Sequence, residues 1–247
     1  MLAERREVLG GLLTVLGGTC CSRHAMAQTS GCWVPQGQAQ PYFDRVQGRT
    51  TMFNSGSERL EPRSGNQQLD RALAQALGKM SRLFGVLPGF CYYDDGTQGN
   101  ALATGDQLLD RSDGTVMFGL SFLRELLSRP QHGDAAIVAV CAHEYGHIVS
   151  YKYRQYDELK RTGGTFRVEQ FADYFAGYYA GNRKLERPDF PAVVFATTQR
   201  SFGGGDHGTG QQRGEAVQAG FLAAYQQRLN PEQARAAGLA FCMGRSG

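Results

Sequence analysis

The chain has 247 residues, of which 41% are hydrophobic and 20% are charged. This composition allows one globular core and excludes the disordered and fibrous classes of protein. The formal net charge of +3 is small for the length, and acidic and basic residues are interspersed. We therefore expect no electrostatic nucleic-acid-binding surface and no nucleic-acid partner.

Residues 1–27 have the pattern of an export signal peptide. Arg5 and Arg6 precede the apolar run 8–18, and Ala25 and Ala27 form a small-x-small cleavage site. The arginine pair resembles a twin-arginine signal, with an ordinary secretory signal as the alternative. No later stretch is apolar over the roughly 18 residues that a membrane span needs. We therefore expect a periplasmic or secreted protein with no membrane span after signal cleavage.

The cysteines fit this expectation but do not choose a disulfide pattern. Cys20 and Cys21 lie in the signal, where lipidation is an alternative to simple cleavage. The cysteines that remain are Cys32, Cys91, Cys141 and Cys242. An oxidising compartment allows disulfides, and four cysteines permit three pairings. Because Cys141 lies close to His143 in the sequence, a buried free thiol is the alternative there.

Residues 28–65 are rich in Gly, Gln, Pro and Ser, and they predict a poorly structured lead-in with room for one strand. The folded domain is expected to span 66–247. Apolar residues at helical spacing predict an amphipathic helix over 69–84. Strand-like runs follow in "FCYYDD", "NALATG" and "GTVMFGLSFL", separated by polar turns and leading into a helix that ends at Leu127.

The second half of the chain predicts helices almost throughout. Asp134 is a suitable cap for a helix over 134–153. Further helices are expected at 166–183, 189–200, 212–228 and 231–242. These elements indicate an α+β fold in which helices predominate beside a small sheet.

The stretch "CAHEYGHIVS", residues 141–150, places ionisable side chains inside the predicted apolar helix. His143 and His147 are four residues apart, about 40° around the helix axis, so both rings lie on one face and can bind one zinc ion. Glu144 is offset by about a quarter turn, within reach of a metal-bound water. Gly146 costs the helix roughly 1 kcal/mol, which is expected where a side chain would crowd the metal or a neighbouring helix.

A hydrolytic zinc site needs a third protein ligand and an open position for water. Glu169 and Asp173 are four residues apart in the apolar stretch "EQFADYFAG", where unpaired carboxylates are costly to bury. Glu169 is the expected third ligand, and Asp173 is expected to orient a ligand imidazole by a hydrogen bond. The alternative is that the histidines are incidental and the carboxylates cap the helix or face water.

These residues resemble the gluzincin metallopeptidases. The motifs "NALATG", "GTVMFGLSFL", "HEYGH", "EQFADYFAG" and "HGTGQQR" are similar, in this order, to the family that includes the CAAX prenyl proteases and the heat-shock membrane protease. The chain also resembles the bacterial neutral zinc metallopeptidases, which share "ADxFAG" and "HGT" followed by an arginine. The likeness covers roughly residues 68–228. It implies a zincin-like fold with a small mixed sheet beside the active-site helix.

The resemblance also implies roles for residues that spacing alone does not single out. His207 and Arg213 match residues that polarise the substrate carbonyl and stabilise the oxyanion. An edge strand is expected to pair with an extended substrate through Asn100, Ala101, Leu102 and Ala103. The transmembrane helices of the membrane members have no counterpart after the signal, so their membrane role does not carry over.

The sequence therefore predicts an exported zinc-dependent endopeptidase that binds one Zn²⁺ and acts on a protein or peptide substrate. One alternative is a catalytically idle zinc-site binding or scaffold protein of the cell envelope, and another is a hydrolase acting on a different carbonyl. The presence of Glu144 argues against the idle protein, because a structural zinc site has no use for a general base and tends to have four protein ligands. The sequence names neither the substrate nor the oligomeric state.

Overall fold

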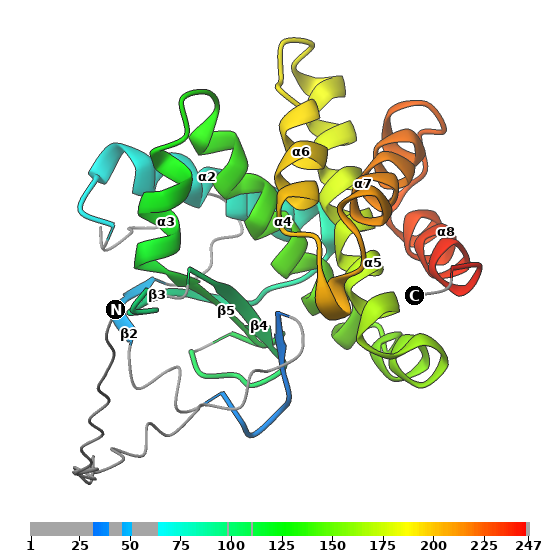
Figure 1. Ribbon diagram of the computed structural model, residues 1–247, viewed down its shortest axis with the longest axis horizontal. Coiled ribbons are helices and arrows are strands. Elements are labelled where there is room, and N and C mark those ends of the chain that lie inside the picture. Colours follow the sequence, from blue (N-terminus) through cyan, green and yellow to red (C-terminus); the bar gives the residue numbers. More distant parts are fainter. Residues whose placement is uncertain (1–31, 40–45, 51–63, 98, 110, 246–247) are drawn as a thin grey trace, which may run out of the picture.

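The fold of the chain is seen in a computed structural model, which describes residues 32–39, 46–50, 64–97, 99–109 and 111–245. The expected export signal lies outside these residues. In Figure 1 a small sheet lies below α2, α3 and α4, and α5 to α8 form a helical group beside them. The expected α+β fold, mainly helical with a small mixed sheet, is confirmed.

Within the described residues the sheet has five strands in the order β1-β4-β5-β3-β2. The strands are β1 (Trp33–Val34), β2 (Val46–Thr50), β3 (Gly89–Tyr93), β4 (Ala101–Thr104) and β5 (Thr115–Gly119). β1 pairs with β4 and β3 pairs with β5 in parallel, whereas the β4–β5 and β2–β3 pairs are antiparallel. Both outer strands come from the lead-in, which was expected to be poorly structured with room for only one strand.

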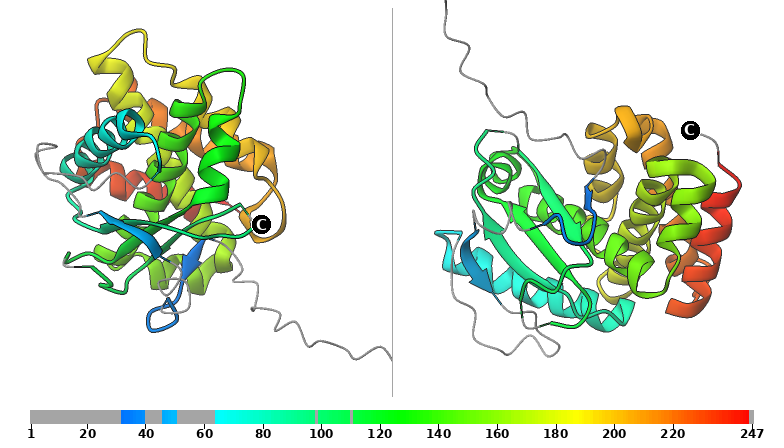
Figure 2. Two further views of the ribbon diagram at one scale, coloured as in Figure 1. Left: turned by 90° about the vertical axis from the view of Figure 1, so that its left-hand side faces the viewer. Right: turned by 90° about the horizontal axis from the view of Figure 1, so that it is seen from below.

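Side chains on the two faces of the sheet enter different hydrophobic clusters. Phe90 and Tyr92 point towards the helices and join the main core, whereas Cys91 and Tyr93 point the opposite way. This alternation is the two-residue period of a strand. The second cluster also contains Val34, Ala39, Leu102 and Met117, so the lead-in helps to cover the face away from the helices, as seen in Figure 2.

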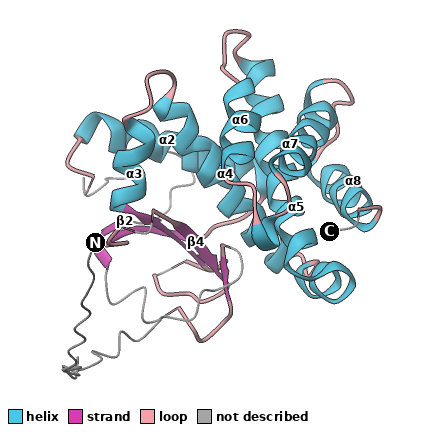
Figure 3. Cartoon of the chain, in the orientation of Figure 1, coloured by secondary structure: helices cyan, strands magenta, loops and turns pink. Residues whose placement is uncertain are grey.

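The helices, coloured cyan in Figure 3, are α2 (Gln67–Phe84), α3 (Leu120–Leu127), α4 (Gly133–Lys152), α5 (Tyr156–Glu186), α6 (Val193–Ser201), η1 (Gly205–His207), α7 (Gly210–Tyr225) and α8 (Pro231–Met243). The predicted helices are confirmed to within a few residues, except that α5 begins ten residues before the predicted 166. Its early part is polar and is separated from the apolar part by a kink at Gly163 and Gly164, which interrupts the hydrophobic period. Among the described residues, no helix is both long and apolar enough to cross a membrane.

Helices α4 and α5 approach each other closely at Gly146. A Cβ atom at this position would lie 2.6 Å from Cα and 2.9 Å from the carbonyl oxygen of Ala172 on α5. Real Cβ atoms do not approach backbone this closely, so a side chain at Gly146 would force the two helices apart. The expectation that a neighbouring helix explains this glycine is confirmed.

The substitution Gly146→Ala is therefore expected to lower the free energy of unfolding. Overpacking costs typically 1–3 kcal/mol, and about 1 kcal/mol of this is offset by the better helix propensity of alanine. Urea denaturation of the metal-free protein measures the difference. The matched control is Gly244→Ala at the end of α8, where the new Cβ would lie 3.7 Å from the nearest atom. Equal stabilities for the two variants would contradict the close contact.

Candidate metal centre

Three side chains from α4 and α5 converge on one point. His143 Nε2 lies 3.2 Å from His147 Nε2 and 3.2 Å from Glu169 Oε2, and His147 Nε2 lies 3.6 Å from Glu169 Oε1. Zinc–ligand bonds of 2.0–2.1 Å at tetrahedral angles place ligand atoms about 3.3 Å apart. These separations therefore suit three ligands of one divalent cation. His143 and His147 come from one helix face, as their spacing predicts.

All three side chains are removed from solvent. Glu169 and His147 are fully buried and His143 is 2% exposed. Burial alone would raise the pKa of Glu169, but the neighbouring His147 and hydrogen bonds from both histidines hold it well below its usual value. Glu169 is thus a carboxylate, which is the form that binds a cation.

Asp173 fixes the orientation of His143. Its Oδ1 lies 2.7 Å from His143 Nδ1, so the imidazole donates its Nδ1 proton to the carboxylate and Nε2 is left to bind a cation. Burial opposes a charged His143, but the charge and hydrogen bond of Asp173 outweigh it and raise the pKa of the histidine well above its usual value. A cation bound at Nε2 would therefore replace a proton. This arrangement matches the role expected for Asp173 from the sequence.

Arg213 on α7 holds Asp173 in turn. Its Nε and one terminal nitrogen donate to the two oxygens of Asp173, both at 2.8 Å, and the same nitrogen donates to Gln199 Oε1. The other terminal nitrogen donates to the carbonyl of Phe202 at 3.2 Å, and the side chain is 2% exposed. These contacts give Arg213 a positioning role through Asp173 and His143. The expected contact of Arg213 with a substrate stays a prediction.

Glu144 borders a small opening beside the three donors. A cavity of about 200 Å³ is lined by Glu144, His143, Phe122, Phe202 and His207, among others. Glu144 is 1% exposed, and its Oε2 has no hydrogen-bond partner within the described part of the chain. Burial raises the pKa of Glu144 to about 8, against the opposing charge of His143. A carboxyl group with such a pKa can accept and release a proton near neutral pH.

His207 and Cys32 complete the surroundings of the donors. His207, from η1, places Nε2 3.4 Å from Glu169 Oε2 and 3.3 Å from Cys32 Sγ. The backbone N–H of Cys32 donates to Glu169 Oε1 at 3.1 Å. The donor atoms of Cys32 and His207 form a group with Glu169, and Cys32 forms another with His143 and Glu144, each within 4.8 Å.

Cys32 was not predicted to lie at this site. The one indication available from the sequence is its residue type, because thiolates are common zinc ligands. That indication applies equally to every cysteine in the chain. Within the described residues, Cys32, Cys141 and Cys242 form no disulfide with one another. Cys141 is buried, in agreement with the free-thiol alternative.

The expected edge strand is only partly an edge. Ala101, Leu102 and Ala103 lie in β4, and the carbonyl of Asn100 accepts a hydrogen bond from Gly119 on the β5 side. On the opposite side, β1 pairs with Ala103 and Thr104. The outermost strand at this end of the sheet is therefore β1, because the lead-in adds to β4 over half its length. Among the residues of β4, Ala101 and Leu102 have no strand paired with them on the outer side within the described part of the chain.

No family model, curated protein or solved structure matches this chain. The resemblance to gluzincin metallopeptidases stays a prediction, which rests on the motifs and their order. The chemistry of the centre is therefore inferred from its geometry and its donor atoms.

The positioning role of Arg213 predicts a large stability effect. Arg213→Gln removes both hydrogen bonds from the guanidinium to Asp173 and leaves His143 as the remaining charged partner of that buried carboxylate, which should lower the free energy of unfolding by roughly 3 kcal/mol, the low end of the cost of breaking a buried ion pair. Denaturation with a chelator present measures this without a contribution from bound metal. The control is Arg187→Gln, which breaks the exposed pair with Asp189 and should change stability by no more than about 1 kcal/mol. A similarly small change for Arg213→Gln would show that the residue is not needed to hold Asp173.

Proposed function

We propose that the chain is an exported zinc-dependent endopeptidase. One observation carries the proposal: the donor atoms of His143, His147 and Glu169 lie at the separations of a single metal site, beside a buried glutamate that borders an opening. Three protein ligands with space next to them are typical of catalytic zinc sites, whereas structural sites have four. The export signal is part of the proposal and rests on residues 1–27 of the sequence.

The donor set favours zinc over the harder cations. Two imidazole nitrogens and one carboxylate oxygen suit zinc, whereas calcium and magnesium prefer oxygen ligands alone. When bound, zinc would polarise a substrate carbonyl and lower the pKa of a water to about 7. The unpartnered Oε2 of Glu144 supports this assignment, since a buried polar atom without a hydrogen bond is rare unless a water or an ion satisfies it.

The side chains around the metal would then have separate roles in peptide hydrolysis. Glu144 accepts the proton of the attacking water and delivers it to the leaving amine. His207, which lines the cavity and is 24% exposed, would donate a hydrogen bond to the developing oxyanion. Asp173 and Arg213 keep His143 in the orientation in which Nε2 faces Glu169 and His147, where it would hold the metal.

A catalytically idle zinc-binding or scaffold protein is the second candidate. The observation that favours it is the thiol of Cys32, which lies among the donors and could close the site with a fourth protein ligand. The presence of Glu144 favours the peptidase, because it borders the cavity as a general base would. Enzymatic and metal measurements separate the two candidates.

Glu144→Gln is expected to bind about one zinc, like the unaltered protein, and to lower the rate of casein cleavage by 10²–10⁴-fold, roughly the contribution of a general base. Mass spectrometry gives the metal content and fluorescent casein gives the rate. The control is Glu158→Gln on the exposed part of α5, which should change neither. Zinc in both proteins without cleavage by either, and without cleavage after Cys32→Ser, would favour the scaffold function, and a folded protein without any metal would contradict both candidates.

Removal of the metal should inactivate and destabilise the protein reversibly. A ligand present at 1,000 times its Kd stabilises the folded state by about 4 kcal/mol, so zinc should raise Tm above that of the chelated protein. His147→Ala should lose this increase, because it removes one ligand. Differential scanning calorimetry with and without zinc makes the comparison. An unchanged zinc-dependent increase in His147→Ala would place the metal elsewhere.

A further inference from the structure

Residues 32–38 lie across the cleft beside the metal centre. Cys32 is at the donor cluster, and Trp33 and Val34 form β1 on the outer side of β4. Further along, Gln36 accepts a hydrogen bond from the Tyr151 hydroxyl at 2.6 Å, and the N–H of Gly37 donates to both oxygens of Asp106 at 2.8 Å. The lead-in is thus bound along β4, the strand that is expected to pair with a substrate.

Cys32 turns its thiol, and not its carbonyl group, towards the centre. Its carbonyl oxygen accepts the N–H of Ala103 at 2.9 Å and is held against β4. Its Sγ lies within 4.8 Å of donor atoms of His143 and Glu144 and, in a second group, of Glu169 and His207. The unpartnered Glu144 Oε2 belongs to one of these donor residues, which points independently to a missing ligand at this place. A strand in this position presents a metal ligand where a substrate would present its scissile carbonyl.

Trp33 anchors the strand next to the ligands. Its ring lies 6.2 Å from the ring of His147 and 5.1 Å from each of the rings of Tyr151 and Tyr156, measured between centroids. The side chain is 5% exposed. The packing of Trp33 therefore helps to hold the neighbouring Cys32 at the centre.

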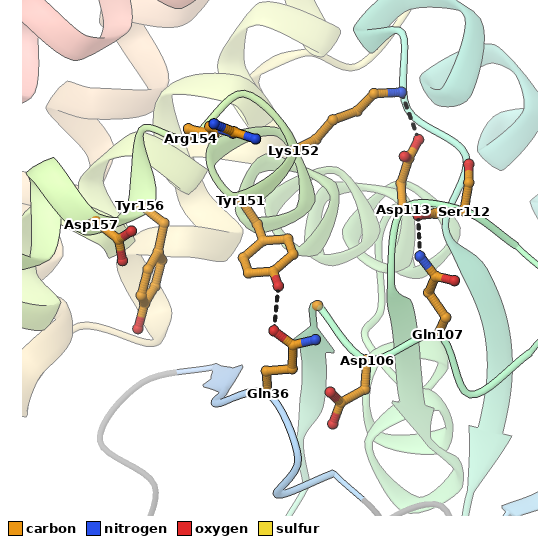
Figure 4. A pocket seen from close by; sticks show the side chains of 11 residues that line it. Gln36, Asp106, Gln107, Ser112, Asp113, Tyr151, Lys152, Arg154, Tyr156 and Asp157 are labelled. Carbon is orange, nitrogen blue, oxygen red and sulfur yellow. Dashed lines mark hydrogen bonds and ion pairs between the residues drawn. The ribbon is translucent and has the colours of Figure 1, made fainter.

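Residues of this segment line two cavities. Cys32 borders the cavity of about 200 Å³ at Glu144, and Gln36 borders a second cavity of about 870 Å³. Figure 4 shows this second cavity between Gln36 and Asp106 on one side and Tyr151, Lys152 and Tyr156 on the other. Residues 32–36 thus reach from the lining of one cavity to the lining of the other.

We propose that Cys32 is a fourth ligand of the metal and that residues 32–34 occupy the substrate position along β4, which keeps the protein in a latent form. The proposal rests on the proposed peptidase function. A thiolate is a strong zinc ligand and would fill the position that water needs. Main-chain pairing with a strand is a general way to bind an extended peptide, so segment and substrate exclude each other. Cleavage of the expected signal after Ala27 would leave Cys32 in the chain.

Cobalt substitution tests the ligand directly. Co²⁺ bound by a thiolate shows a sulfur-to-metal charge-transfer absorption in the near ultraviolet, which nitrogen and oxygen ligands do not give. We expect this band in the cobalt-loaded protein, its loss in Cys32→Ser and its retention in Cys242→Ala, which removes a buried thiol from α8. Circular dichroism checks that each variant is folded. A cobalt protein without the band, or a band that survives in Cys32→Ser, would overturn the proposal.

Peptidase assays on the same zinc-loaded proteins test the latency. Because a tethered ligand acts at a high effective concentration, Cys32→Ser should cleave casein at least about tenfold faster than the unaltered protein, and Cys242→Ala should not. Addition of Glu144→Gln to Cys32→Ser should abolish the gain. Equal rates for Cys32→Ser and the unaltered protein would overturn the latency and leave the peptidase function intact. A thiolate band without cleavage by any variant would support Cys32 as a ligand and overturn the peptidase function.

Discussion

The contact between α4 and α5 is the constraint on which the rest of the structure depends. At Gly146 the two helices meet with no side chain between them, so the backbone of Ala172 lies where a Cβ would be. This short distance brings His143 and His147 on one helix to Glu169 and Asp173 on the other. Helical geometry then determines which residues share a face, because positions four apart lie nearly above one another. The site is rigid because it is built on two packed helices.

Burial of the charged groups is tolerated because each has a partner. Asp173 is paired with Arg213 and accepts a hydrogen bond from His143, and Glu169 is surrounded by imidazoles. An isolated charge in such surroundings would cost several kcal/mol or more. Neutral imidazoles would leave Glu169 without a full countercharge, which a divalent cation would provide. The same buried charges that need partners for the helices to pack would thus also bind the proposed metal.

The lead-in has a larger role than its composition suggests. It forms both outer strands of the sheet and covers the face away from the helices. Next to β1 it also reaches the candidate metal centre, where Cys32 contacts Glu169 from a position 137 residues earlier in the chain. A polar, glycine-rich segment can pair this way because strand pairing uses backbone groups, which every residue except proline supplies in full.

The local sequence was enough to predict the helices, the shared face of His143 and His147, the place of Glu169 and Asp173 four residues apart on one helix and the need for Gly146. These features follow from the helical period, which is a property of neighbouring residues. The tertiary structure decided the rest: the contact of Arg213 with Asp173, the early start of α5, the partial covering of β4 and the place of Cys32. Strand pairing and helix packing join residues far apart in the chain, and no local period encodes which partners meet. The candidate metal ligands can therefore be predicted from the local sequence, whereas the segment that lies beside them is seen only in the fold.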